Sequence, residues 1–507
     1  MVAIRRDWKL LLSVATFVLC VAPTIISYRP HAFTWDDTDY LTRSITVSRS
    51  LWAGDIHGLG AAVHSVRPPI MTLLGLPWKA LASWETVGKC FITLNALTSF
   101  FVALSLYFML RLGMKPFWLA IASSCVLAAL GPFPAEAETH IMATGFMADS
   151  LFAWNALAAM LLIPYEGIAL SSSTLADWRR GLLWAIILLT GAITKASYFY
   201  FLFLIVPIPF AMRWQRLGRR SASVALASLA VCSSPVAFYW LRYGITSLLY
   251  GYQSSFGGIA SFYYVPLFQF LKNTITTLPG LCLSAAFAIA CGGHLAVKRR
   301  RLQSERVLPL LIVAGYCAIG LASANRELRL LFPAIVAPPF LFGLLISGRD
   351  SGIPRASAAV AAVLAFCGLA VAGWPMRHRP DRQCIERSEA VLAEARQRGA
   401  KRVTLATDGA TLNLNLVLLS MAVASSSPSV EVETLAYRAM YHVPIERDFA
   451  AIREADMIVF QDMHAVDSPF TNQRVPEYDR YARDHAAGGP IKVGSDVSIY
   501  LMRPVSQ

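Results

Sequence analysis

The chain has 507 residues, of which 56% are hydrophobic and 15% are charged, and its formal net charge is +14. So few charged residues leave too little polar surface for a soluble protein of this length, so the composition predicts that hydrocarbon surrounds much of the chain. The positive charge is concentrated in short loops between apolar runs, which orientation in a membrane explains better than nucleic-acid binding. We therefore expect an integral membrane protein with membrane lipids, and no nucleic acid, as partners.

Apolar runs near the length of about 20 residues that crosses a bilayer recur from residue 10 to residue 374. The first run follows Arg5, Arg6 and Lys9 and has no small-residue cleavage site after it, so we predict a retained first span with a cytoplasmic N-terminus. Basic loops recur at residues 111–115, 178–180, 213–220, 298–306 and 349–355. Placing all of them in the cytoplasm predicts about eleven spans. The expected fold class is a polytopic α-helical membrane protein, with a membrane domain over residues 1–375.

Because successive spans cross the membrane in alternating directions, the cytoplasmic basic loops place three long loops on the outer side, at residues 29–85, 131–148 and 241–277. Residues 181–212 form an apolar segment that is too long for one ordinary span, and both of its flanks are basic. We therefore predict a tight hairpin of two short helices, with a turn near Thr194 and Lys195. This turn would place Lys195 at the outer face.

The C-terminal residues 376–507 follow the last apolar run and are expected outside the cytoplasm. Strand-like runs at residues 402–406, 430–436, 457–461 and 497–503 alternate with helix-like runs at 412–424, 446–455 and 477–485. This order predicts a small α/β domain. The tail contains no glycine-rich phosphate loop and no nucleophile motif, so we expect it to support the membrane domain.

The first outer loop opens with the sequence TWDDTDY at residues 34–40, which contains Asp36, Asp37 and Asp39. A solvated loop explains such an acidic run as well as a functional site does. The loop continues with an amphipathic stretch at residues 41–52 and then Arg67-Pro68-Pro69 before another apolar stretch, which is typical of an interfacial or re-entrant segment. Such a segment would hold the acids close to the membrane surface.

Two cations are predicted on the same face. Lys195 lies within an apolar run, where a charge costs roughly 2.5–3.5 kcal/mol on insertion scales and tends to be retained for function; a snorkelling lysine is the alternative. Arg326 lies where a span re-enters from outside, and a topological charge paired with Glu327 is its alternative. A carboxylate opposite cations suits transfer from a phosphate-bearing lipid, because cations hold the phosphate while the carboxylate deprotonates an incoming hydroxyl.

At these residues the chain resembles the GT-C superfamily of polyprenyl-phosphate-sugar-dependent glycosyltransferases, in particular protein O-mannosyltransferases and lipid A aminoarabinose transferases. The resemblance is a series of short motifs across the membrane region. The acidic pair and tyrosine of the family's first outer loop look like Asp36, Asp37 and Tyr40 here, and the basic residue of its basic-Pro-Pro element looks like Arg67. The acid that opens the fourth span looks like Asp149, the hairpin lysine like Lys195, and the later arginine element like Arg326.

The resemblance implies an inverting glycosyltransferase in a bacterial cytoplasmic membrane, acting on the cell envelope. Asp36 would be the catalytic base, polyprenyl phosphate would leave against Lys195 and Arg326, and the other matching residues would bind donor or acceptor. The donor would be a polyprenyl-phosphate sugar, and the acceptor a glycan, a lipid or a protein. One position departs from the pattern: Val66 stands where aminoarabinose transferases carry a glutamate.

No cofactor is indicated with certainty. The second outer loop carries Glu136, Glu138 and His140, which resemble the acidic pair that related oligosaccharyltransferases use for a metal. A divalent ion at these residues and ordinary solvated loop acids are both open. Two other classes remain as alternatives. An O-antigen polymerase or ligase would present its large outer loop late in the chain, and a transporter or flippase would show repeated halves with charges near the midplane.

Overall fold

The computed structural model describes residues 7–26, 28–31, 35–63, 67–79, 81, 83–130, 148–168, 173–257, 265–277, 286–289, 304–324, 326, 331–347, 377–380, 382–409, 412–424, 430–439, 442–462 and 473–503. The chain forms two compact units, which we describe separately. The first comprises Met1–Ser27, His64–Met71 and Phe91–Met376, and the second comprises Tyr28–Val63, Thr72–Cys90 and Arg377–Gln507.

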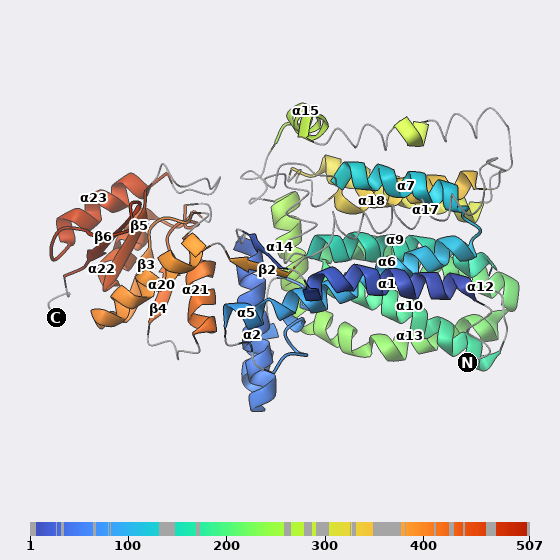
Figure 1. Ribbon diagram of the computed structural model, residues 1–507, viewed down its shortest axis with the longest axis horizontal. Coiled ribbons are helices and arrows are strands. Elements are labelled where there is room, and N and C mark those ends of the chain that lie inside the picture. Colours follow the sequence, from blue (N-terminus) through green and yellow to red (C-terminus); the bar gives the residue numbers. More distant parts are fainter. Residues whose placement is uncertain are drawn as a thin grey trace. The chain divides into compact units, whose positions relative to one another are not determined.

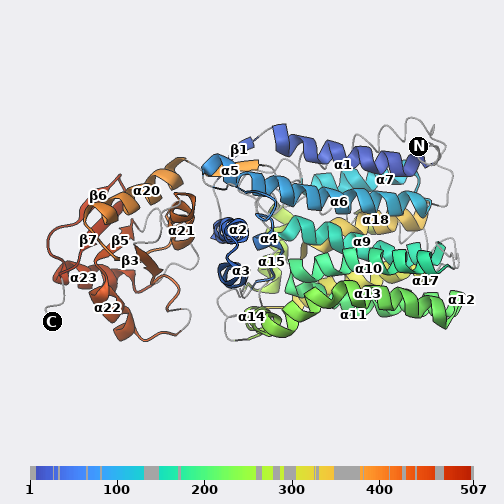
Figure 2. The ribbon, with the colours of Figure 1, turned by 90° about the horizontal axis from the view of Figure 1, so that it is seen from below.

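The first unit is a bundle of α-helices, most of which run side by side along one direction (Figures 1 and 2). Its helices are α1 (Trp8–Ile26), α6 (Lys89–Arg111), α7 (Pro116–Leu130), α9 (Ala148–Ile168), α10 (Thr174–Thr194), α11 (Phe199–Ile205), α12 (Pro207–Leu217), α13 (Arg219–Tyr239), α14 (Ile245–Ser255), α15 (Leu267–Thr277), α17 (Ser304–Ala322) and α18 (Phe332–Ile346). A 3-10 turn, η2 (Ala196–Tyr198), precedes α11, and a π-helical turn, η3 (Trp240–Gly244), joins α13 to α14.

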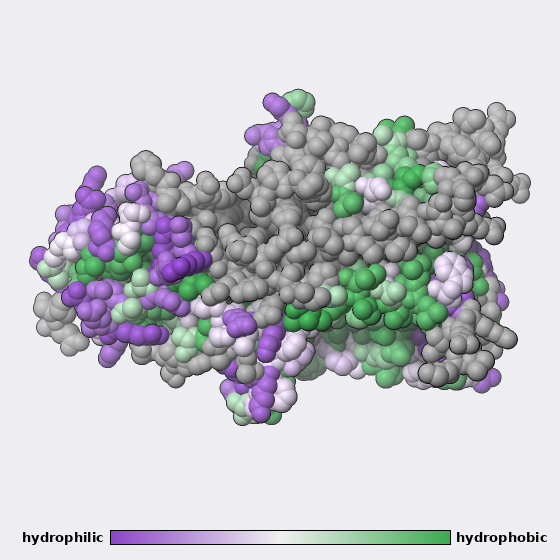
Figure 3. All heavy atoms as spheres, viewed as in Figure 1, coloured by the Kyte–Doolittle hydropathy of each residue, from purple (hydrophilic) through white to green (hydrophobic). Residues whose placement is uncertain are grey.

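Within the described residues, five helical segments are long and apolar enough to cross a membrane. They are Trp84–Arg111, Ala148–Ile168, Ala196–Leu217, Arg219–Gln253 and Glu305–Ala322. Large apolar side chains such as Val18, Val231 and Leu311 are more than half exposed on these and neighbouring helices. Figure 3 shows hydrophobic residues gathered over the helices of this unit. These features agree with the expected helical membrane protein, and the count of about eleven spans stays a prediction.

Helix α9 is the most buried helix of the first unit. All of its side chains from Ala148 to Glu166 are buried, as expected for a helix that is apolar all round. It packs against α10, α11, α12, α17 and α18. Its two buried acids, Asp149 and Glu166, lie near opposite ends, and their Cα atoms are about 25 Å apart along the axis at the helical rise per residue.

The turn predicted within residues 181–212 is present, but its two helices are not short: α10 has 21 residues and begins at Thr174, and the returning segment Ala196–Leu217 has 22. Helix α10 ends at Thr194, and Lys195 follows in an extended conformation (φ −146°, ψ 141°) before η2, α11 and α12 return along the bundle. The turn is tight because Gly191 has no side chain: a Cβ there would lie 2.1 Å from Cζ of Tyr198. The Tyr198 ring therefore packs directly on the last turn of α10.

The second unit contains a five-stranded sheet with the order β4-β3-β5-β7-β6. Strands β3 (Arg402–Leu405), β4 (Glu431–Thr434) and β5 (Met457–Gln461) are parallel, while β7 (Val497–Leu501) runs antiparallel to β5 and to β6 (Ile491–Val493). One apolar core joins α20 (Arg382–Gln397) and α21 (Leu414–Val423) to the sheet, and a second core joins α22 (Ile445–Glu454) and α23 (Val475–His485) to it. The tail is therefore an α/β domain, as its alternating runs predict.

The second unit also includes segments of residues 29–85, which were predicted to form an outer loop. Strand β1 (Tyr28–His31) pairs in parallel with β2 (Arg377–Pro380), and the loop continues as α2 (Trp35–Ala53), α3 (Ile56–Val63), the short α4 (Ile70–Leu73) and α5 (Trp84–Val87). The predicted amphipathic stretch at residues 41–52 lies in α2. Its buried side chains include Leu41, Ile45 and Val47, and α2 packs against α3 and α21. Protein therefore covers much of the face that we expected to lie on the membrane.

Candidate functional site

The residues predicted for the site are divided between the two units. Asp36 and Asp37 fall in the first turn of α2, and their side chains lie outside the described part of the structure. Tyr40, one turn further along α2, is half-buried. Glu136, Glu138 and His140 lie outside the described residues. The remaining four belong to the first unit: Arg67, Asp149, Lys195 and Arg326.

Lys195 and Asp149 form an ion pair between the end of α10 and the beginning of α9. The Asp149 side chain is 4% exposed and that of Lys195 is 19% exposed, so the pair is largely withdrawn from water. Asp149 lies in the first turn of α9 and Lys195 caps the last turn of α10. Each charge therefore lies at the helix end whose dipole favours it. This contact differs from that of a snorkelling lysine, which extends to the membrane surface, because the ammonium binds a buried carboxylate.

Aromatic side chains surround this pair. The Lys195 ammonium lies 5.6 Å from the ring centroid of Phe152, one turn after Asp149 on α9, in the range of a cation–π contact. The Phe152 ring is 6.0 Å from that of Tyr198 and 6.2 Å from that of Tyr316 on α17. The sequence did not single these residues out, because aromatic side chains in apolar runs also fill ordinary helix packing.

Arg326 lies four residues after the end of α17. Its Nε donates to the carbonyl of Leu321 at 2.9 Å, and its Nη1 donates to the carbonyl of Val265. Helix α17 starts at the opposite end of the bundle, where Glu305 pairs with Arg216. Because Tyr316 already reaches Phe152 near the start of α9, the end of α17 lies toward the Lys195 end. Arg326 is thus held at the end of the bundle that carries Lys195.

Arg67 is found at the same end of the first unit. Its carbonyl accepts a hydrogen bond of 3.5 Å from the hydroxyl of Tyr239, the last residue of α13. The first turn of α13 lies at the other end, since Ser221 donates to Asp177 at 2.8 Å there. Arg67, Asp149, Lys195 and Arg326 therefore share one end of the bundle, as the parity of the spans predicts.

The opposite end carries a second buried ionic cluster, which the sequence did not reveal. Arg213 on α12 is 1% exposed; it donates to Glu166 at 2.5 Å and also to Asp177. Arg180 lies 3.4 Å from Glu166 as well. The expected basic loops at residues 178–180 and 213–220 need correction, because residues 178–180 lie inside α10 and Arg213 lies in α12. Arg180 and Arg213 each have an acidic partner, Glu166, on the neighbouring helix α9.

No family model matches the chain, and no curated protein matches it at a significant level. A solved structure is similar over 98% of both chains: ArnT from Cupriavidus metallidurans bound to undecaprenyl phosphate, with 13% sequence identity and a TM-score of 0.46. A similarity of this degree leaves the chemistry to be argued from the residues themselves.

Proposed function

We propose that the protein is an inverting glycosyltransferase that moves a sugar from a polyprenyl-phosphate donor to an acceptor on the outer side of the membrane. The observation that carries this proposal is the clustering of Lys195, Arg326, Arg67 and Asp149 at one end of a membrane-type helix bundle. Charges at the depth of a bilayer are costly and mark binding or transport pathways. A lipid phosphate is an anion that such a group can receive directly from the membrane.

Lys195 is suited to hold the phosphate of the donor. Its ammonium has three N–H donors, and Asp149 takes one of them. Asp149 therefore acts as a positioning residue, because it fixes the ammonium at the turn. The buried rings of Phe152 and Tyr316 pack beside the pair and help to fix the position of the ammonium. Arg326 would add a guanidinium, which matches phosphate oxygens geometrically.

Asp36 is the proposed base. As the acceptor hydroxyl attacks the anomeric carbon, the carboxylate takes its proton and the C–O bond to the lipid phosphate breaks. The electron pair of that bond leaves on the phosphate, whose added negative charge Lys195 and Arg326 stabilise. Attack from the side opposite the leaving group inverts the anomeric configuration. Asp37 and Tyr40 would orient the acceptor or the sugar beside this base.

The donor-binding part is tested by measuring undecaprenyl phosphate affinity of the full chain in detergent micelles. Losing a hydrogen bond to a charged group costs roughly 1.5–3 kcal/mol, so Lys195→Ala and Arg326→Ala should each weaken binding at least about tenfold. Arg242→Ala is the matched control, since Arg242 is an exposed cation beyond the end of α13. Size-exclusion profiles confirm that each variant is folded. If both site variants kept their affinity for undecaprenyl phosphate, Lys195 and Arg326 would act only in setting the orientation of the helices in the membrane.

A further inference from the structure

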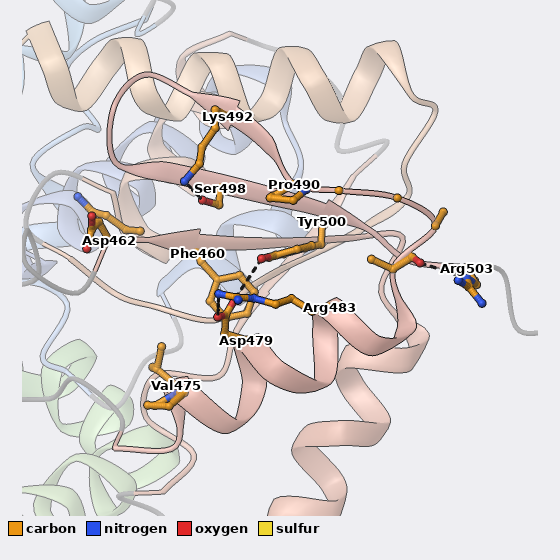
Figure 4. Close-up of a pocket in the computed structure, with 16 residues that line it drawn as sticks. Phe460, Asp462, Val475, Asp479, Arg483, Pro490, Lys492, Ser498, Tyr500 and Arg503 are labelled. Atoms are coloured by element: carbon orange, nitrogen blue, oxygen red, sulfur yellow. Dashed lines mark hydrogen bonds and ion pairs between the residues drawn. The ribbon is translucent and has the colours of Figure 1, made fainter.

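The second unit contains a cleft that the proposed transfer chemistry does not use. It has a volume of about 910 Å³ and lies between α23 and the β6–β7 hairpin, as Figure 4 shows. This is within the size range of pockets for small organic ligands. Six of its lining residues carry the argument: Phe460, Asp479, Arg483, Lys492, Tyr500 and Arg503.

One side of the cleft is a fixed ionic arrangement on α23. Asp479 accepts from Arg483 one turn later on the helix, and its other oxygen accepts from the Tyr500 hydroxyl at 3.1 Å. Figure 4 shows these three side chains converging beside Phe460. The hydrogen bond to Asp479 raises the pKa of the Arg483 guanidinium further above its usual value. An arginine is in any case charged in proteins. The charge of Asp479 is thus largely engaged in holding Arg483 and Tyr500.

The remaining cations of the cleft have no such acidic partner. Lys492 donates to the Ser498 hydroxyl at 2.7 Å, and Nε of Arg503 donates to the Ala486 carbonyl at 3.1 Å. Among the described residues, neither cation has a carboxylate within the 4.0 Å of an ion pair. Among the described lining residues, three cations stand against two acids, Asp462 and Asp479. The cleft therefore favours a ligand with negative charge.

The shape and the other lining residues describe the rest of that ligand. The rings of Phe460 and Tyr500 lie edge to face at 5.7 Å and give the cleft an apolar floor with one polar tip. On the rim, Gly488 and Gly489 have open space where a side chain would stand, so the backbone there is accessible. An aromatic floor, hydroxyl and amide groups and an accessible backbone suit a ring-shaped polyhydroxylated molecule better than a bare inorganic anion.

We propose that this cleft binds an anionic saccharide, a sugar bearing a phosphate or a carboxylate, as part of the acceptor. That the bound sugar belongs to the acceptor rests on the proposed function. The binding of an anionic sugar in the cleft does not depend on it. Lys492 and Arg503 hold the anionic group by charge-assisted hydrogen bonds, and Tyr500 and Phe460 contact the ring. The cleft would then select acceptors by charge through residues other than those proposed to hold the donor phosphate.

The test is calorimetric titration of the full chain in detergent with four probes: glucuronate, glucose 6-phosphate, glucose and inorganic phosphate. We expect the two anionic sugars to bind and glucose not to bind. Inorganic phosphate should bind more weakly than glucose 6-phosphate. The two anionic sugars also distinguish a carboxylate from a phosphate as the preferred group. Binding of glucose equal to that of glucuronate, or of phosphate equal to that of glucose 6-phosphate, would overturn the proposal.

Variants locate the binding. Lys492→Ala combined with Arg503→Ala should weaken binding of both anionic sugars at least about tenfold, since two charged hydrogen bonds are lost. The matched control is Lys401→Ala combined with Arg396→Ala, which removes two exposed cations elsewhere in the same domain. Lys195→Ala should leave glucuronate binding unchanged. If Lys195→Ala weakened glucuronate binding and the cleft variants did not, the proposed binding in the cleft would be refuted. If the cleft bound anionic sugars as expected but the donor-lipid test failed, only the transferase proposal would be refuted.

Discussion

The ammonium of Lys195 contacts the carboxylate of Asp149, which joins two helices through residues 46 positions apart in the sequence. The contact ties the turn after α10 to the first turn of α9, the most buried helix of the first unit. Removing one partner of a buried pair leaves an uncompensated charge, whereas removing both leaves none. Single and double substitutions can therefore separate the contribution of the pair to stability from its contribution to donor-lipid binding.

The first prediction is a double-mutant cycle at this pair. Lys195→Met should lower the free energy of unfolding by about 3 kcal/mol, at the lower end of the range for buried pairs because Lys195 retains some exposure. Adding Asp149→Asn should recover part of that loss, as thermal unfolding in detergent would measure. The double variant should still bind donor lipid poorly. Recovery of both stability and lipid affinity would limit Lys195 to a structural role.

A second prediction concerns the buried cluster at the other end of α9. Arg213→Ala leaves Glu166 and Asp177 without their shared guanidinium and should cost roughly 3–5 kcal/mol. Arg213→Lys should recover little, because an ammonium cannot span both carboxylates as a fork does. Arg216→Ala is the control: this arginine pairs with Glu305 while 35% exposed, and it should cost about 1 kcal/mol or less. Equal melting temperatures for Arg213→Ala and Arg216→Ala would contradict the buried network.

Part of the fold could be predicted because its causes are local. The turn at Lys195 follows from a charge in the middle of an apolar segment of double length, and strands such as β5 follow from short apolar runs. Helix α20 was missed because it is rich in charge, although Cys384, Ser388, Val391 and Ala395 repeat on one face with helical spacing. That periodicity is the signal that would have revealed it.

The site was predicted less completely than the fold. Motif order and span parity brought Lys195, Asp149 and Arg326 to one end, but the contact between Lys195 and Asp149 depends on how α9 and α10 pack. The cluster around Arg213 was missed for the same reason. Counting basic residues by loop treats every arginine as a solvated charge, and only tertiary packing shows which of them meets a buried acid.

A third prediction tests the orientation of the bundle. In a cysteine-free background, Ser197→Cys should react with a membrane-impermeant thiol reagent added from outside, because Ser197 is exposed in the turn after α10. Leu175→Cys, 61% exposed at the other end of α10, should react only from the cytoplasm. Glu454→Cys at the end of α22 reports on the C-terminal domain and should also react from outside. Labelling of Ser197→Cys exclusively from the cytoplasm would reverse the orientation on which the active-site proposal depends.

The last prediction concerns the acids Asp36, Asp37 and Asp39, whose spacing along α2 separates their expected roles. Asp36 and Tyr40 are one turn apart and share a face of the helix, whereas Asp37 is displaced by about 100° around the axis. Asp39 pairs with Arg43 at 2.9 Å one turn later on the same helix, so its charge already has a local partner. These positions give three acids within four residues three different expected effects.

Asp36→Asn keeps the shape of the side chain and removes the base, so transfer should fall by ~10²–10⁴-fold while donor-lipid affinity stays near that of the native chain. Asp39→Asn should be mild, because a helical i,i+4 pair contributes only a few tenths of a kcal/mol. Asp37→Asn should fall between them, since a neighbouring carboxylate raises the pKa of its partner or hydrogen-bonds the acceptor. The measurement is single-turnover transfer of labelled sugar from a polyprenyl-phosphate donor, with donor binding measured on the same preparations. If Asp37→Asn lost activity and Asp36→Asn kept it, Asp37 would be the base; if both kept it, the glycosyltransferase proposal would be wrong.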